Sequence, residues 1–176
     1  MGKDWHIGGR ALAVLAVLLL AAWLFRKTPT PQNTPQDKEG FPVLNFQDSD
    51  PAMNAAMNKA RATLPNFISA LGEDNPSREL FGIKMKVQDE FGRAYVWIVD
   101  VKLEDDMFTG ILVNTPRYVR TVKAGQTLQV SSSKISDWSY VENGKLVGGY
   151  TMRVGWDRLS AEEQKRQESK LGFKMN

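Results

Sequence analysis

The longest apolar run of the chain stands near its N-terminus, between basic residues. Fifteen apolar residues, 11–25, follow Arg10 and precede two further basic residues. As a helix this run measures about 22 Å, which is shorter than the roughly 30 Å hydrocarbon core of a bilayer. The helix becomes long enough if it starts near Ile7 and if Arg10 extends its side chain to the headgroups. We therefore expect a membrane helix over residues 7–25.

This segment has two interpretations, a cleaved secretory signal peptide and an uncleaved anchor. No A-x-A cleavage motif follows the run, and Leu20 would stand at the third position before a cut after Ala22. The pattern therefore favours an uncleaved anchor over residues 1–27. We expect the N-terminus to stay inside, which places the rest of the chain on the periplasmic or extracellular side.

A proline-rich segment, 28–40, follows the apolar run. It contains three prolines and few apolar residues, a composition that is unable to bury a core and is typical of an extended tether. Fully extended, it would hold the next domain up to about 40 Å from the bilayer. The chain thus divides into an anchor or signal peptide at 1–27, a linker at 28–40 and a domain at 41–176.

A helical pattern opens the domain. Asp50 is a favourable helix cap, and Pro51 suits the first turn, where no backbone N–H is needed. Apolar side chains then recur at helical spacing and form one stripe that we expect to face the core: Met53, Ala56, Met57, Ala60 and Leu64. Pro65 should end or kink this helix, and a short second segment should continue to Gly72.

Strand patterns fill the middle of the domain. Residues 81–87 alternate between apolar and polar, which indicates a half-buried strand with Lys84 and Lys86 on its polar face. Residues 94–103 begin apolar on both faces, which is typical of a central strand. Further segments with strand character follow at 108–114, 126–131, 137–142 and 146–154.

Turn and cap signals complete the pattern. Asn143-Gly144 predicts a hairpin between the last two strand segments. Ser160 and Glu163 form a capping box for a polar helix of about ten residues. Together these elements predict the α+β class: an N-terminal helix packed on a curved antiparallel sheet of about five strands, then a short C-terminal helix. A single transmembrane helix would precede this domain.

The net charge of +3 resides in the predicted membrane segment. Residues 1–27 hold four basic residues and one acidic residue, whereas the rest of the chain holds 19 of each. The domain is therefore formally neutral, and we do not expect a nucleic-acid partner.

Two residue types that carry much metal and catalytic chemistry are missing from the domain. The chain has no cysteine, and its only histidine is His6, in the membrane flank. This excludes disulfides, thiolate metal sites, and histidine-based metal sites or nucleophiles within the domain. No glycine-rich phosphate loop is present. We expect no cofactor and no metal.

Two weaker motifs have simpler explanations. Ser131 and Lys134 have the S-x-x-K spacing of serine acyl-enzymes, but that motif belongs at a helix start, and here it joins two predicted strands. Acidic pairs at 89–90 and 105–106 fall in turn-like segments, where solvated turns account for them better than metal or glycosidase chemistry does.

The richest candidate region runs from Ile135 to Arg153. Its aromatic and polar side chains would meet across the hairpin if both arms are strands, and Asp137 could bond locally or pair with Arg153. Residues 117–153 carry six basic and two acidic residues, a charge that would attract an anionic ligand or could be paired internally. One interpretation is a hairpin with a buried tryptophan and a satisfied arginine. The other is a binding site that comprises Asn114, Asp137, Trp138, Tyr150, Thr151 and Arg153.

Four motifs stand in a fixed order in this domain: DPAMNAAMNKARATLPNF, GILVNTP, AGQTLQV and ISDW…GGYTMR. In this order they resemble the YegJ-like family of bacterial proteins, a domain of unknown function, over roughly residues 48–159. The resemblance implies a small α+β domain, often exported or membrane-attached, and it implies no activity. The motif positions are Asn114, Pro116, Gly125, Asp137, Trp138, Gly149, Tyr150, Thr151 and Arg153.

One departure from the family pattern bears on chemistry. In that pattern an acidic residue and a histidine commonly precede the tryptophan of the central strand. Here Ala94 and Tyr95 occupy those places before Trp97. If the family used such a pair for chemistry, this chain lacks it, which favours binding over catalysis.

Three functional hypotheses follow. The leading one is a non-catalytic, membrane-tethered binding module that faces the envelope space, with an envelope protein or an anionic ligand as partner. A second is an immunity or inhibitor protein that neutralises a toxin or hydrolase. A third is a small hydrolase that uses Asp137 with Tyr140 or Tyr150.

Overall fold

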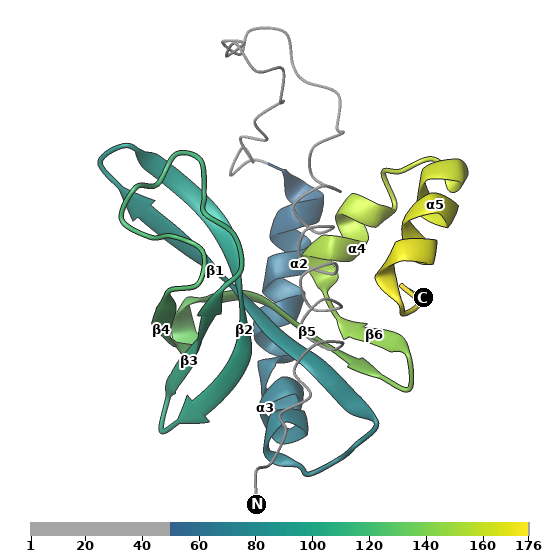
Figure 1. Ribbon diagram of the computed structural model, residues 1–176, viewed down its shortest axis with the longest axis horizontal. Coiled ribbons are helices and arrows are strands. Elements are labelled where there is room, and N and C mark those ends of the chain that lie inside the picture. The colour runs from purple at the N-terminus through teal and green to yellow at the C-terminus, as the bar shows by residue number, and fades with distance from the viewer. Residues whose placement is uncertain (1–49, 176) are drawn as a thin grey trace, which may run out of the picture.

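A computed structural model describes the chain from Asp50 to Met175, apart from the side chains of residues 169 and 170 (Figure 1). The predicted anchor and linker, 1–27 and 28–40, lie outside these residues. Within residues 50–175, no helix is both long and apolar enough to span a bilayer. In chain order the elements are α2 (Pro51–Ala62), α3 (Leu64–Gly72), β1 (Arg78–Asp89), β2 (Gly92–Glu104), β3 (Met107–Leu112), β4 (Thr127–Ser131), η2 (Ser132–Lys134), β5 (Ile135–Glu142), β6 (Lys145–Gly148), α4 (Tyr150–Trp156) and α5 (Ala161–Leu171).

The predicted N-terminal helices are confirmed. The Asp50 carboxylate accepts hydrogen bonds from the backbone N–H groups of Ala52 and Met53, at 3.1 and 3.2 Å, and so caps α2. Helix α2 ends before Thr63, and Pro65 then stands in the first turn of α3. Proline is tolerated in a first turn but not in the interior of a helix. The buried stripe of α2 packs on the sheet.

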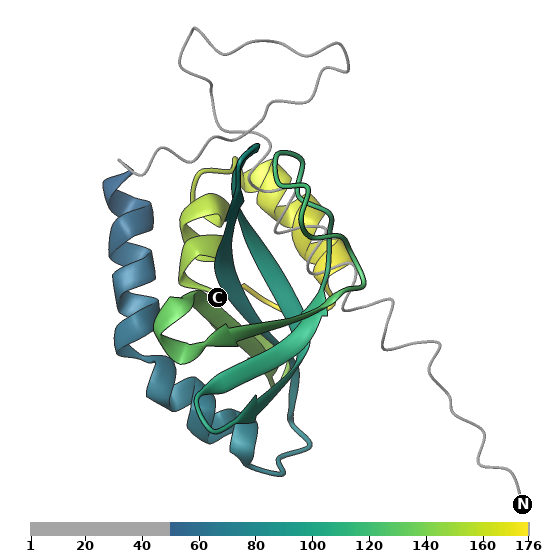
Figure 2. The same ribbon diagram turned by 90° about the vertical axis from the view of Figure 1, so that its left-hand side faces the viewer.

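The described strands form one antiparallel sheet of six strands, in the order β4-β3-β2-β1-β5-β6. The α+β class and the antiparallel sheet are confirmed, with six strands where the sequence predicts about five. β4 lies at an edge while β5 lies beside β1, yet only the three residues of η2 join them. So short a connection requires the sheet to curl until β4 approaches β1, and Figure 2 shows this curvature.

Helices cover both faces of the sheet. Figure 2 shows α2 and α3 on one side of it and α5 on the other. In β2, Val96 and Ile98 join the core under α2 and α3, whereas Trp97 and Val99 join a second core with α4 and the C-terminal segment. Successive side chains of a strand point to opposite faces, so β2 is buried on both sides, as predicted for a central strand.

The second core overturns one expectation for β1. The alternation over residues 81–87 is confirmed for the apolar side chains, since Ile83 and Val87 are buried. Lys84, however, which the alternation places on the polar side, is only 4% exposed. The reason is that α4 covers this face of β1 and brings Thr151 onto the lysine.

The predicted strand over residues 146–154 is also wrong beyond its first residues. β6 ends at Gly148, and α4 begins at Tyr150. Gly148 and Gly149 have φ angles of 71° and 61°, a left-handed conformation that glycine adopts readily and that ends a strand. Two such residues in succession redirect the chain into a helix, even though the residues around them favour strands.

Gly148 offers a sharp test of this packing. Its φ is positive, and an added Cβ would overlap the carbonyl oxygen and indole ring of Trp138. Gly144, in the preceding turn, has a φ of 72° and open space around it. We expect Gly144→Ala to cost about 1 kcal/mol from backbone conformation alone, and Gly148→Ala to cost about 2 kcal/mol more from the overlap.

Urea denaturation of the purified protein, followed by tryptophan fluorescence, would measure both losses. Equal losses for the two variants would show that the chain absorbs the added methyl at Gly148, and would contradict the close contact.

Candidate functional site

Asp137 lies at the centre of the region that the sequence singles out. It is completely buried. Its Oδ1 accepts hydrogen bonds from the backbone N–H groups of Trp138 at 2.8 Å and Tyr150 at 3.2 Å. Its Oδ2 accepts from the backbone N–H and the hydroxyl of Thr151, at 2.7 and 2.6 Å. A carboxylate on β5 thus caps the start of α4, where backbone donors have no partner within the helix.

Lys84 completes this buried network from β1. Its Nζ donates a hydrogen bond of 3.0 Å to Thr151 Oγ1, and the same hydroxyl donates to Asp137. The ammonium also lies 5.8 Å from the ring centroid of Tyr95 and 5.9 Å from that of Trp97. Lys84 therefore donates to Thr151, and Thr151 donates to Asp137. This order suits an ammonium, which only donates, and a carboxylate, which only accepts.

Burial shifts the two charged groups in opposite directions. Burial lowers the pKa of Lys84 to about 8, although the nearby Asp137 carboxylate works against this shift. Burial raises the pKa of Asp137, while Lys84, Thr151 and the backbone donors oppose that change. Both pKa shifts arise because burial removes the charged form of each group from water.

Of the two alternatives for Asp137, a local bond and a pair with Arg153, the structure shows the local bond, from the N–H of Trp138. The helical turn of α4 directs Arg153 toward backbone carbonyl groups instead. Its Nε donates to Gly148 O at 3.0 Å, and its guanidinium also donates to Leu146 O at 2.7 Å and to Met175 O. Arg153 therefore ties the C-terminal segment to β6.

The aromatic members of the predicted site belong to the core. Trp138 is 2% exposed, and its indole N–H donates to Ala60 O in α2 at 2.8 Å. Tyr150 meets the Trp138 ring edge-on at 5.6 Å, and its hydroxyl accepts from Thr63 at 3.1 Å. These contacts hold α2 to β5 and to the start of α4. The interpretation of a buried tryptophan and a satisfied arginine therefore describes these residues.

Asn114 is separate from this cluster. It lies half-buried in the loop after β3, and no hydrogen bond among residues 50–175 joins it to Asp137. Of the predicted site residues, the structure thus brings together Asp137, Trp138, Tyr150 and Thr151. It leaves Asn114 and Arg153 elsewhere.

Lys84, the partner charge of this network, is not among the residues that the sequence pattern singles out. A signal for it existed, because an aspartate that a strand buries beside a tryptophan needs a cation or several hydrogen-bond donors nearby. The alternation of β1 concealed it, since a lysine at every second position is the normal pattern of a solvent-facing strand side.

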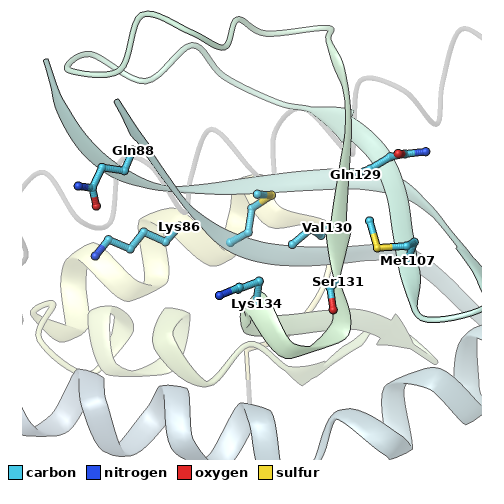
Figure 3. Close-up of a pocket in the computed structure, with 8 residues that line it drawn as sticks. Lys86, Gln88, Met107, Gln129, Val130, Ser131 and Lys134 are labelled. Carbon is cyan, nitrogen blue, oxygen red and sulfur yellow. The ribbon is translucent and has the colours of Figure 1, made fainter. Parts of the chain in front are cut away.

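A groove beside the last residues of β1, beyond the point where β1 stops pairing with β5, is open to solvent. It is a cavity of about 420 Å³ between β1 and the edge strand β4, within the size range of ligand pockets. Figure 3 shows Val130 and Lys134 pointing from β4 and η2 toward β1, from which Lys86 and Gln88 extend. Its lining comprises Met85, Lys86, Gln88, Met107, Gln129, Val130, Ser131 and Lys134.

The S-x-x-K residues form one end of this groove without forming a serine–lysine pair. Ser131 Oγ donates to Asp106 Oδ2 at 3.0 Å and lies 3.1 Å from Ser133 Oγ. Among the described residues, no hydrogen bond or ion pair holds Lys134. The lysine is exposed, so its charge faces the groove and the solvent.

Asp89 organises the loop that carries the chain from β3 to β4. Its carboxylate accepts from the N–H groups of Phe91 and Gly92, at 2.9 and 3.1 Å, and from those of Arg120 and Thr121, at 2.6 and 3.2 Å. Burial opposes ionisation, but these four donors outweigh it and lower the pKa of Asp89. This turn role confirms the structural interpretation of the 89–90 pair. Residues 50–175 contain no group of three metal-binding side chains.

The buried network predicts a strong coupling between Asp137 and Lys84. Asp137→Asn should cost about 3–5 kcal/mol, because it leaves a buried ammonium without its counter-charge. Lys84→Met should then cost at least about 1 kcal/mol less in the Asp137→Asn background than in the wild type. The exposed Lys86, two residues along β1, supplies the control: Lys86→Met should cost the same in the wild type and in the Asp137→Asn background. Urea unfolding of the wild type, the two single variants and the double variant measures the coupling. Additive losses at Lys84 and Asp137 would contradict it.

The same lysine predicts a dependence on pH. Its pKa is about 8 in the folded protein and 10.5 ordinarily, so between these values the unfolded chain binds more protons. The free energy of unfolding therefore rises with pH in this window. We expect a rise of about 1.5 kcal/mol between pH 8 and pH 9.5 that is absent in Lys84→Met. A wild-type curve that is flat or parallel to that of the variant would contradict the assignment.

Comparison with known proteins places this domain in a family. Residues 50–175 match the family model "Uncharacterized protein conserved in bacteria (DUF2314)". The chain is 32% identical over 101 residues to the uncharacterized protein YegJ of Escherichia coli K12, an alignment that covers 57% of this chain and 65% of that protein. It is 30% identical over 148 residues to a putative ankyrin repeat protein of Neisseria meningitidis serogroup B, covering 74% of this chain and 55% of that protein. The chain thus spans less than two thirds of the length of either relative, and no solved structure matches it. The match over residues 50–175, together with the similarity to YegJ, shows that the chain belongs to the DUF2314 family of uncharacterized bacterial proteins.

Proposed function

We propose that the chain is a membrane-tethered, non-catalytic binding module outside the cytoplasm that recognises an acidic protein partner. The apolar run at 7–25 would anchor it, and the linker at 28–40 would let the domain reach about 40 Å from the bilayer. The partner would bind in the groove between β1 and β4.

The single observation that supports this proposal is the charge of the groove. Lys86 and Lys134 enter its lining from two different elements, β1 and η2, and no carboxylate is among the lining residues. Neither lysine has an ion-pair partner among the described residues. Asp106 lies near one end, where it accepts a hydrogen bond from Ser131, and its single negative charge is smaller than the charge of the two lysines. A groove with two unpaired ammonium groups attracts a negatively charged partner and repels a basic one.

The contrast with the buried cluster strengthens this choice of site. Asp137 and Thr151 are 0% and 1% exposed, so a ligand has no access to them in this conformation. A hydrolase that uses Asp137 would need that access. The groove, in comparison, is lined by the exposed ends of Lys86, Gln88 and Lys134.

Site-specific photo-crosslinking in native membranes tests the proposal. A benzoylphenylalanine at Gln129, an exposed groove residue, should give an adduct with an acidic protein that mass spectrometry can identify. The same group at Lys165, on the opposite helical layer, should not. The double charge reversal Lys86→Glu with Lys134→Glu should remove the adduct, and Lys165→Glu should leave it unchanged. An adduct that survives the reversal, or no adduct specific to position 129, would overturn the proposal.

A further inference from the structure

We propose that the partner enters the groove as an extended acidic segment and adds to the edge of β4 as a new strand. This inference rests on the proposed function, and it goes further by naming the form and chemistry of what binds. Three features of the described residues carry it: an unprotected strand edge, a second edge opposite it, and the charge of the groove.

The first feature is the open edge of β4. β4 is the terminal strand of the sheet and pairs with β3 on one side only. Its five residues, Thr127–Ser131, include no charged residue and no proline, which are the devices that usually protect an edge from pairing with another chain. Nothing in the described part of the chain forms a ladder with its outer side.

The other terminal strand of the sheet, β6, has its outer edge covered by the chain. The backbone N–H of Leu146, in β6, donates to Lys174 O at 2.9 Å, and the N–H of Lys174 donates to Gly144 O at 2.8 Å. The C-terminal segment therefore lies along β6 as a parallel bridge and covers that edge. Of the two edges of this sheet, one is covered by the chain itself and the other is left open beside the groove.

The second feature is a strand edge on the far side of the groove. β1 pairs with β5 only as far as Met85, which lies opposite Ile135. From Lys86 to Asp89, β1 pairs with β2 alone. The curl of the sheet therefore places two single-sided edges, β4 and the end of β1, on the two walls of one groove (Figure 3). A peptide strand between them would find backbone donors and acceptors on both sides.

The third feature selects the side chains of the segment. Residues of an added strand point alternately to its two faces. The groove offers apolar contact at Met85 and Val130, and ammonium groups at Lys86 and Lys134. A segment that alternates apolar and acidic residues satisfies both. The length of β4, at about 3.3 Å per residue, accommodates about five residues of it.

A random hexapeptide library displayed on phage, selected against the full chain in detergent, tests this inference. We expect enriched peptides with acidic residues at alternate positions. N-methylation of the backbone of a selected peptide should weaken its binding at least tenfold, because a methylated amide is unable to donate to a strand edge. The bound peptide should slow hydrogen exchange of the amides in 127–131, with the covered strand 145–148 as the internal control. Selection against Lys86→Glu with Lys134→Glu should yield basic peptides instead.

The outcomes separate this inference from the proposed function. Acidic peptides that bind with no effect of N-methylation, and with no protection at 127–131, would overturn strand addition. They would leave the groove as an acidic-partner site. A selection that yields no peptide, or peptides without acidic residues, would also overturn strand addition. The crosslinking experiment at Gln129 would then decide independently whether a protein binds the groove at all.

Discussion

The connection between β4 and β5 is the constraint on which the rest of this domain depends. Three residues of η2 carry the chain from the edge of the sheet to a strand beside β1. Because β4 and β5 run in the same direction, they behave as one long strand that bends at η2 and pairs with β3 before the bend and with β1 after it. The sheet curls around this bend. Its concave side then encloses the core under α2 and α3, and β4 is left facing β1 across an open groove.

Burial of both faces of the sheet is the second determinant of the architecture. α4 has only seven residues, too few to be stable as a helix in isolation. Its position depends on the sheet: Asp137 caps it, Thr151 joins it to Lys84, and Met152 and Trp156 pack into the second core. A buried ion pair contributes little net stability, because desolvation offsets attraction. Lys84 and Asp137 instead fix the position of α4. Thr151, in the first turn of this helix, must lie between the lysine that donates to its hydroxyl and the carboxylate that accepts from it.

Local patterns predicted the parts of the fold that local chemistry determines. The cap at Asp50, the break before Pro65, the central strand at 94–103, the Asn143-Gly144 turn and the capping box at Ser160 all match the structure. The failures lie where distant segments decide. Tyr150 and Thr151 favour strands by type, but the left-handed pair at 148–149 turns the chain before them. Lys84 looks solvent-facing until α4 covers it. The groove was not predictable at all, because its walls are more than forty positions apart in the chain and meet only through the curl.

The family resemblance rests on residues that hold the fold together, and it does not include the residues that give the groove its charge. Of the motif residues, Asp137, Trp138 and Thr151 make internal hydrogen bonds, and Arg153 binds backbone carbonyl groups. Gly149 turns the chain into α4. These residues hold the framework of the domain, so a match that rests on them indicates a shared fold. Lys86 and Lys134, which give the groove its charge, lie outside all four motifs. Lys86 and Lys134 are exposed and make no ion pair among the described residues, so a relative could keep the framework and change the charge of the groove at little cost in stability. Shared family membership therefore supports the same curled sheet and the same β4 edge in a relative, whereas the charge of the groove depends on residues that the motifs do not include.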